Sequence, residues 1–214
     1  MTEPLRDEAA EAEVTRSETA YHGRVWNIRR DEVVYDGQTI VREYMDHTGA
    51  VSILALDDDD RVLLIKQYRH PIRARDWEIP AGLLDVVDED ALAAAQRELA
   101  EEADLVAARW DVLAEFHTTP GGSDEAIRVY LARDLAPAAE RFEREAEEAD
   151  IEVRWEPLDE VVTAVLERRV HNPSLVVATL AAHASRARGW STLVPGDAPW
   201  PGRSRPVGAG VTED

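Results

Sequence analysis

The chain contains no cysteine, which excludes several kinds of site at once. Disulfides, thiolate zinc sites, iron–sulfur clusters and cysteine nucleophiles all need a thiol. Positive charge is also scarce, since 24 Lys and Arg face 44 Asp and Glu, for a formal net charge of −20. Such a surface does not suit a protein that wraps DNA or coats anionic lipid. We therefore expect neither a nucleic acid nor a membrane as partner.

The sequence also lacks an apolar run long enough to span a bilayer, and its first residues are acidic rather than a basic start followed by an apolar segment. We therefore expect a cytoplasmic protein. Its 214 residues suit one domain, since domains most often have roughly 100 to 200 residues. No period of about 20 to 50 residues repeats, which excludes a solenoid or a propeller.

The two ends differ in composition from the middle of the chain. Residues 1–17 are rich in acidic groups and alanine, which predicts an acidic tail, either a short helix or disordered. Residues 189–214 are rich in proline and glycine, which predicts a tail or strap without a regular element. Trp190 and Trp200 in this segment are candidates for docking on the body of the protein.

Alternating and helical patterns between the ends predict an α+β protein. We expect a small antiparallel sheet within residues 18–48, with a turn at Asp36-Gly37, and further strands on both sides of a polar turn at residues 57–60. Helical periodicity is strongest at residues 89–103 and weaker at 158–168 and 174–186, and strands recur near residues 112–116, 127–131 and 151–155. Because strands and helices do not alternate strictly, a sandwich is favoured over a doubly wound parallel sheet.

The helix expected at residues 89–103 carries the most informative pattern. On a helix, Glu98, Glu101 and Glu102 fall within about 100° of one another, and the apolar residues lie on an adjacent face. Carboxylates at these spacings repel one another, so a cation between them is expected. Mg²⁺ or Mn²⁺ suits an all-oxygen ligand set and would imply a phosphate ester or anhydride as substrate. The alternative is a solvated acidic face in which Arg97 pairs with Glu101.

The residues around this helix resemble the Nudix box. Gly82, Glu89, Arg97-Glu98-Leu99-Ala100-Glu101-Glu102 and Leu105 follow the family's order of glycine, glutamate and an acidic helix. Two features depart from the pattern: the loop after Gly82 has one extra residue, and Asp104 replaces the usual glycine after the helix. Aspartate tolerates the left-handed conformation of a helix C-cap, so this turn can still form.

The resemblance extends over roughly residues 19–185. Pro120 and Gly121 resemble the marker of the ADP-ribose pyrophosphatase subgroup, particularly bacterial members of the actinobacterial kind. The resemblance implies an α/β/α Nudix sandwich with a mixed sheet at residues 49–188, preceded by the N-terminal sheet, which would serve dimerisation. It also implies Mg²⁺-dependent hydrolysis of ADP-ribose to AMP and ribose 5-phosphate by a homodimer.

The resemblance further implies roles for individual residues. The metal ligands would be Glu98, Glu102 and the Ala81 carbonyl, with Glu101 as a shared carboxylate. Gly82, Glu89 and Arg97 would shape the loop, although Glu89 can equally be a first-turn acid that follows an Asp88 cap. The general base would come from an acidic loop at residues 145–150, with Glu147 and Glu148 as candidates.

Substrate contacts are also expected from this resemblance. Arg69 would hold the diphosphate or terminal phosphate, with Glu78 beside it. Arg42 would hold the adenine or ribose, and Trp26 would stack on the base unless it is a core or dimer-interface aromatic. Alternative functions are hydrolysis of another nucleoside diphosphate derivative, such as an ADP-sugar, NADH or an oxidised nucleotide, and non-catalytic sensing of ADP-ribose. No histidine is assigned a role.

Overall fold

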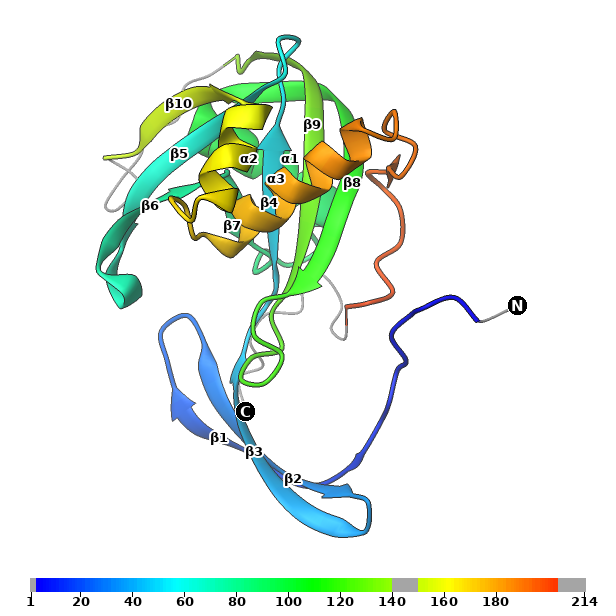
Figure 1. Cartoon of the computed structure of the whole chain (residues 1–214). Coiled ribbons are helices and arrows are strands. Elements are labelled where there is room, and N and C mark those ends of the chain that lie inside the picture. The colour runs from blue at the N-terminus through cyan, green and yellow to red at the C-terminus, as the bar shows by residue number, and fades with distance from the viewer. Residues whose placement is uncertain (1–2, 140–149, 204–214) are drawn as a thin grey trace.

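A computed structural model of the chain describes residues 3–139 and 150–203. The elements are β1 (Glu13–His22), β2 (Asn27–Tyr35), β3 (Gln38–Asp46), β4 (Ala50–Ala55), β5 (Arg61–Arg69), the 3-10 turn η1 (His70–Ile72), β6 (Ala74–Glu78), β7 (Ala81–Leu83), α1 (Ala91–Ala103), β8 (Leu105–His117), β9 (Ala126–Pro137), β10 (Glu152–Pro157), α2 (Leu158–Leu166), α3 (Pro173–Arg186) and β11 (Val194–Pro195). Figure 1 shows a sandwich of strands and helices from which the sheet β1–β2–β3 projects.

The projecting sheet is an antiparallel meander. Asp36 and Gly37 form the turn between β2 and β3 with φ values of 49° and 71°, as the sequence predicts. Positive φ at both central positions matches the right-handed twist of the two strands. Within the described residues, neither of the two core clusters includes a residue of β1, β2 or β3. The sheet is therefore held to the body mainly at the end of β3, where Met45 bonds to the backbone of Gly122.

The structure corrects the secondary structure expected at the N-terminus. Strand β1 begins at Glu13, so residues 13–17 are extended rather than a helix or a disordered tail. These residues pair with β2 from Glu13↔Val34 onward, and the Thr15 hydroxyl donates to the Glu32 carbonyl at 3.1 Å. Backbone pairing to a neighbouring strand needs no large apolar side chains, which is why composition alone did not reveal the strand.

The central sheet has five strands in the order β11-β8-β9-β4-β7, and β10-β5-β6 forms a second sheet. Only β4 and β9 pair in parallel within these two sheets, so the central sheet is mixed. The predicted polar turn at residues 57–60 is confirmed, but it carries the chain from one sheet to the other rather than closing a simple hairpin. The Asp57 carboxylate accepts from the backbone N–H of Asp59 and Arg61 at 3.0 and 2.8 Å.

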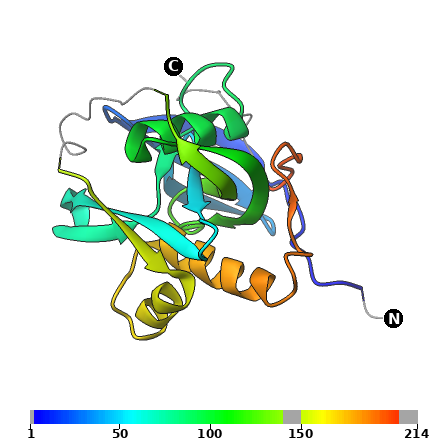
Figure 2. The same cartoon turned by 90° about the horizontal axis from the view of Figure 1, so that it is seen from above.

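Strand β4 shows why the core has two halves. Its side chains alternate, so that Val51 and Ile53 pack toward α1 whereas Ala50 and Leu54 belong to the cluster with α2 and α3. Figure 2 shows α1 on one side of the strands and α2 with α3 on the other. This arrangement confirms the predicted α/β/α sandwich. No helix in residues 3–139 and 150–203 has the length and apolarity needed to cross a membrane.

Residues 189–203 form a C-terminal strap that contains a regular element, contrary to the prediction. Strand β11 pairs with the edge strand β8 at Val194↔Val112 and Pro195↔Asp111, and a strand this short leaves no periodic pattern in the sequence. Both tryptophans dock: Trp190 lies 5.1 Å from the Arg133 guanidinium, and Trp200 lies 4.8 Å from that of Arg128. The strap thus follows the edge of the central sheet toward the end of β3.

Candidate functional site

The acidic helix α1 has well-defined ends. The Asp90 carboxylate accepts from the Ala93 N–H at 2.8 Å, which makes Asp90 the N-cap and corrects the expected Asp88 cap. Asp88 has a φ of 63° and lies in the loop that accommodates the extra residue after Gly82. Asp104 ends the helix in the left-handed conformation with a φ of 54°, as predicted.

Arg97 joins the loop before α1 to the acidic face of the helix. Its Nε and Nη2 donate to the two carboxylate oxygens of Glu89 at 2.9 and 3.0 Å. Its Nη1 donates to Glu98 at 2.6 Å and to Glu101 at 2.9 Å. The hydrogen bonds to Glu89 are the main cause that raises the pKa of Arg97 above its ordinary value. Glu89 therefore pairs with Arg97 and does not lie in the first turn of the helix.

Strand β7 contacts two carboxylates of the helix, Glu98 and Glu102. The Ala81 N–H donates to Glu102 Oε2 at 2.9 Å, and Glu102 is buried. A Cβ placed on Gly82 would lie 2.0 Å from Glu98 Oε1 and 2.1 Å from its Cδ, so only glycine leaves room for this side chain. The strand and the helix thus bring Ala81, Gly82, Glu98 and Glu102 together, as the sequence predicts.

The chemistry of this group fits a hard divalent cation, because it consists of carboxylate oxygens around a cradle that a Cβ would fill. In the part of the chain that the structure describes, no three acidic or histidine side chains are already arranged to hold a metal ion. Two of the helix carboxylates, Glu98 and Glu101, bind Arg97 in this conformation.

A cleft of about 520 Å³ opens next to this group. Ala81 and Gly82 line it, and so do three residues predicted to contact substrate: Trp26, Arg69 and Glu78. Arg69 Nε and Nη2 donate to the two oxygens of Glu78, both at 2.7 Å, and Glu78 is only 2% exposed. Glu78 therefore orients the guanidinium that was expected to hold a phosphate, and it already accepts from two of the nitrogens of this group.

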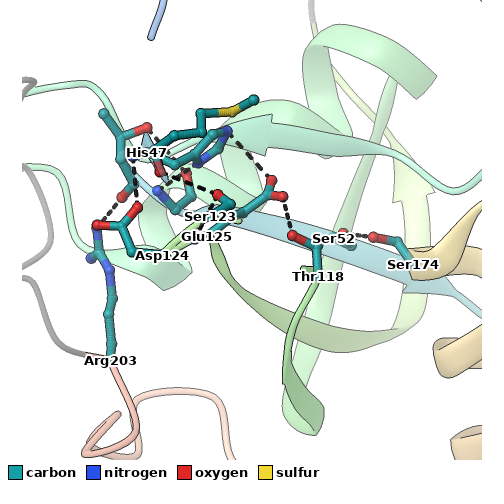
Figure 3. A network of polar contacts seen from close by, with 11 residues as sticks. His47, Ser52, Thr118, Ser123, Asp124, Glu125, Ser174 and Arg203 are labelled. Carbon is teal, nitrogen blue, oxygen red and sulfur yellow. Dashed lines mark hydrogen bonds and ion pairs between the residues drawn. The ribbon is translucent and has the colours of Figure 1, made fainter. Parts of the chain in front are cut away.

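The cleft is also lined by residues to which the sequence assigned no role. His47, Thr118 and Glu125 belong to the polar network of Figure 3, and Ser52 and Ser174 are buried, with their hydroxyls 3.0 Å apart. His47, Thr118 and Glu125 lie in the connections after β3 and before β9, whereas Ser52 belongs to β4 and Ser174 to the first turn of α3. Their spacing could not reveal the site, because contacts between distant segments bring them together: the end of β3 with residues 118–125, and β4 with α3.

The remaining predicted substrate residues lie in a different place. Arg42, Pro120 and Gly121 line a second hollow of about 460 Å³, between β3 and the turn that precedes β9. Within one copy of the chain, Arg42 and Pro120 therefore do not line the cleft that contains Trp26. Glu147 and Glu148, the candidates for the general base, lie outside the described residues.

The sandwich, the acidic helix and the glycine beside it define a class of protein. The NUDIX domain profile matches residues 46–178, which is most of the chain. The chain therefore belongs to the Nudix family, whose members typically depend on a divalent metal, and the resemblance found in the sequence is confirmed.

Three proteins of known name are similar to this chain over most of its length. An ADP-ribose pyrophosphatase of Mycobacterium tuberculosis is 42% identical over 189 residues, which cover 88% of this chain and 90% of the relative. An ADP-ribose pyrophosphatase of Bacillus subtilis is 32% identical, with 76% of this chain and 87% of the relative covered. A methanol dehydrogenase activator of Bacillus methanolicus is also 32% identical, with 78% and 90% covered.

A solved structure supports the fold independently of close sequence similarity. The structure of an ADP compounds hydrolase superposes with a TM-score of 0.68 at 20% identity, and the match covers 86% of this chain and 99% of the other. The superposition covers nearly the whole of that chain, so the similarity concerns the overall architecture.

Proposed function

We propose that this protein hydrolyses the diphosphate of ADP-ribose to AMP and ribose 5-phosphate with the help of Mg²⁺, for which Mn²⁺ can substitute. The two relatives named ADP-ribose pyrophosphatase support this substrate, and each matches more than three quarters of the chain. Pro120 and Gly121, in the turn before β9, are the sequence feature that favours ADP-ribose over other nucleoside diphosphate derivatives.

The observation that carries the proposal is the contact between β7 and α1 at the edge of the cleft. Gly82 leaves space for Glu98, and Ala81 binds Glu102, so two carboxylates are held next to residues that line the cleft. A diphosphate in the cleft would place its charge beside these carboxylates, which is unfavourable unless a cation lies between them. The position of these two carboxylates beside the cleft therefore supports a metal-dependent reaction.

Glu98, Glu102 and the Ala81 carbonyl are the proposed metal ligands, and Glu101 is the proposed shared carboxylate. A divalent cation there supplies charge neutralisation for the diphosphate and favours ionisation of a water molecule. Arg97 contributes by holding Glu98 and Glu101 on the same side of the helix as Glu89. The proton of the attacking water would pass to Glu147 or Glu148.

The cleft also offers contacts to the organic parts of the substrate. Glu78 fixes the Arg69 guanidinium by two oxygens, and Arg69 lines the cleft, so a phosphate of the substrate would bind beside this cation. Trp26 offers an aromatic ring to the base, since the residue is 39% exposed and lines the cleft. These contacts would orient the diphosphate toward the carboxylates of α1.

We further propose that the protein is a homodimer in which the sheet β1–β2–β3 contacts the partner. Its strands contribute nothing to the two core clusters and expose Val14, Tyr21 and Tyr35 by 52%, 66% and 65%. A three-stranded sheet needs a packed face for stability, and a second copy would supply one. In such a dimer Arg42 and Pro120 would face the partner's cleft.

Sedimentation velocity tests the homodimer and should give about twice the chain mass of 23.9 kDa. A monomer at micromolar concentration would contradict this proposal.

Steady-state hydrolysis of a substrate panel tests the proposed function. Wild type, Glu102→Gln and the exposed control Glu167→Gln would be assayed with ADP-ribose, an ADP-sugar, NADH and an oxidised nucleotide in the presence of Mg²⁺. We expect the highest kcat/KM for ADP-ribose, a loss of at least 100-fold in Glu102→Gln and no change in the control. If another nucleotide is hydrolysed faster than ADP-ribose, that nucleotide is the substrate and the proposal is wrong on this point. If no nucleotide is hydrolysed, a sensing role is favoured.

A further inference from the structure

His47 is a buried histidine in the wall of the cleft that the proposed reaction does not use. It follows β3, is only 4% exposed and lies against the indole of Trp26. The two ring centroids are 5.4 Å apart and the planes differ by 22°, which is a stacked arrangement. One side of the indole is therefore covered by the imidazole, while Trp26 still lines the cleft.

The hydrogen bonds of His47 define its tautomer. The Gly49 N–H donates to Nδ1 at 3.0 Å, so Nδ1 is an acceptor and the ring proton is on Nε2. Nε2 lies 3.4 Å from Glu125 Oε1. Gly49 has a φ of 82°, a conformation that suits glycine and directs its N–H to the ring.

Two carboxylates connect His47 to the segment at residues 118–125. The second oxygen of Glu125 accepts from the Thr118 hydroxyl, and Figure 3 shows Glu125 between His47 and Thr118. The backbone N–H of His47 donates to Asp124 Oδ1 at 2.8 Å. The imidazole is thus fixed at its ring and at its backbone. A ring held in this way can fix a second ring that stacks on it.

Trp26 needs such support because of its position in the chain. It lies in the link between β1 and β2, next to Val25, which is 48% exposed. An indole on an exposed link would have several rotamers available, and each rotamer that binding excludes lowers affinity. Stacking on a fixed imidazole removes this cost before the ligand arrives.

We propose that His47 is a positioning residue that, through Glu125 and Thr118, holds the Trp26 indole as a preformed stacking wall for the nucleobase of the substrate. The proposal rests on the proposed function for the identity of the nucleotide and for the placement of its base against Trp26. Stacking of a base on an aromatic side chain favours binding of any base with a flat face, so the wall contributes affinity and does not select adenine by hydrogen bonds. His47 itself does not contact the reacting atoms.

The test measures AMP binding by calorimetry without metal, in wild type, Trp26→Ala, His47→Ala and the double variant. We expect Trp26→Ala and His47→Ala each to weaken AMP binding about tenfold, since each removes the stacking wall. The double variant should be no weaker than Trp26→Ala, because His47 acts through the indole. His183→Ala, a change at an exposed histidine of α3, is the matched control and should bind AMP as wild type does.

Binding of ribose 5-phosphate shows whether His47→Ala affects only the base-binding wall or the whole cleft, because this ligand has no base. Its binding should be unchanged in His47→Ala, and hydrolysis of ADP-ribose should show a KM about ten times higher with kcat within twofold. His47→Gln restores a donor toward Glu125 and should recover part of the loss. In ¹⁵N-histidine spectra, the imidazole signals that disappear in His47→Gln belong to His47, and they should show the proton on Nε2.

The outcomes distinguish this inference from the proposed function. Wild-type AMP affinity in His47→Ala, an equal loss of AMP and ribose 5-phosphate binding, or independent losses in the double variant would each overturn the role of His47. A wild type without measurable AMP binding would overturn it as well. If AMP binding depends on His47 but ADP-ribose is not hydrolysed, the proposed function fails and the stacking wall stands.

Discussion

Gly82→Ala is the sharpest perturbation of the proposed metal site, because it adds one methyl group at the contact between β7 and α1. The added Cβ would lie 2.0 Å from Glu98 Oε1, 2.1 Å from Cδ and 2.4 Å from Cγ. Ordinary contacts between such atoms are about 3.5 Å, so the Glu98 carboxylate must move by roughly 1.5 Å. The backbone of Gly82 has no positive φ that alanine would resist. The strain therefore falls on a flexible side chain.

The expected cost in stability is small and the expected cost in activity is large. A side chain forced away from its rotamer costs about 0.5–1.5 kcal/mol, and about 1 kcal/mol lowers Tm by roughly 2–4 °C in a protein of this size. A catalytic group misplaced by about 1 Å can cost about 100-fold in rate. We therefore expect Gly82→Ala to lower kcat about 100-fold and Tm by only a few degrees.

The assay combines ADP-ribose hydrolysis over a Mg²⁺ titration with a thermal melt of each variant. Gly82→Ala should also need more Mg²⁺ for half-maximal rate, since Glu98 is a proposed ligand. Gly202→Ala is the matched control, because no atom lies within 4 Å of its added Cβ, and it should match wild type in rate and melting. Wild-type kcat and Mg²⁺ dependence in Gly82→Ala would refute the role assigned to Glu98.

Four further predictions test other parts of the account. Chelation with EDTA should abolish turnover and added Mg²⁺ should restore it, whereas turnover in excess chelator would contradict metal dependence. Arg97→Gln removes the cation from the three glutamates that it binds, so Tm should fall by several degrees, from a loss of about 1–2 kcal/mol, and kcat should fall about tenfold; an unchanged melt would show that these ion pairs are not important. Burial is the main cause that raises the pKa of Tyr44 from 10.0 to about 12, so the folded state keeps a proton that the unfolded chain loses, and the free energy of unfolding should decrease as pH rises from 10 to 12; Tyr44→Phe should flatten this decrease in denaturant titrations, and an equal slope would refute the assignment. Trp200→Ala should cost about 2 kcal/mol, less than a fully buried tryptophan, with kcat/KM within twofold of wild type, and a large loss of activity would give the C-terminal strap a direct role in the site.

The sequence predicted those features in which the local pattern and the tertiary contact agree. Helix α1 could be found because its carboxylates, its apolar face and the turn at Asp104 all follow from a single periodic segment. Two roles were open for Glu89, in the loop or as a first-turn acid, and the N-cap at Asp90 together with the pairing to Arg97 places it in the loop. The α/β/α layers were expected from the resemblance to the Nudix family, and the structure builds them on strands such as β4, which contributes side chains to both core clusters.

Features that depend on distant segments could not be predicted in the same way. His47 and Glu125 are 78 positions apart, and their contact exists only because the end of β3 pairs with the turn before β9. The engagement of Arg69 by Glu78 depends on the register between β5 and β6, which a one-residue shift would change. Strand β1 was missed because its partner, rather than its own composition, makes it a strand.

The most direct test of the central claim is the hydrolysis of ADP-ribose in ¹⁸O-labelled water with Mg²⁺, followed by mass spectrometry of the products. Wild type should release AMP and ribose 5-phosphate with one ¹⁸O atom in the phosphate of one product, which identifies the attacked phosphorus, and Glu102→Gln should release neither. Unlabelled products, cleavage at a bond outside the diphosphate, or full activity of Glu102→Gln would contradict water attack supported by the carboxylates of α1.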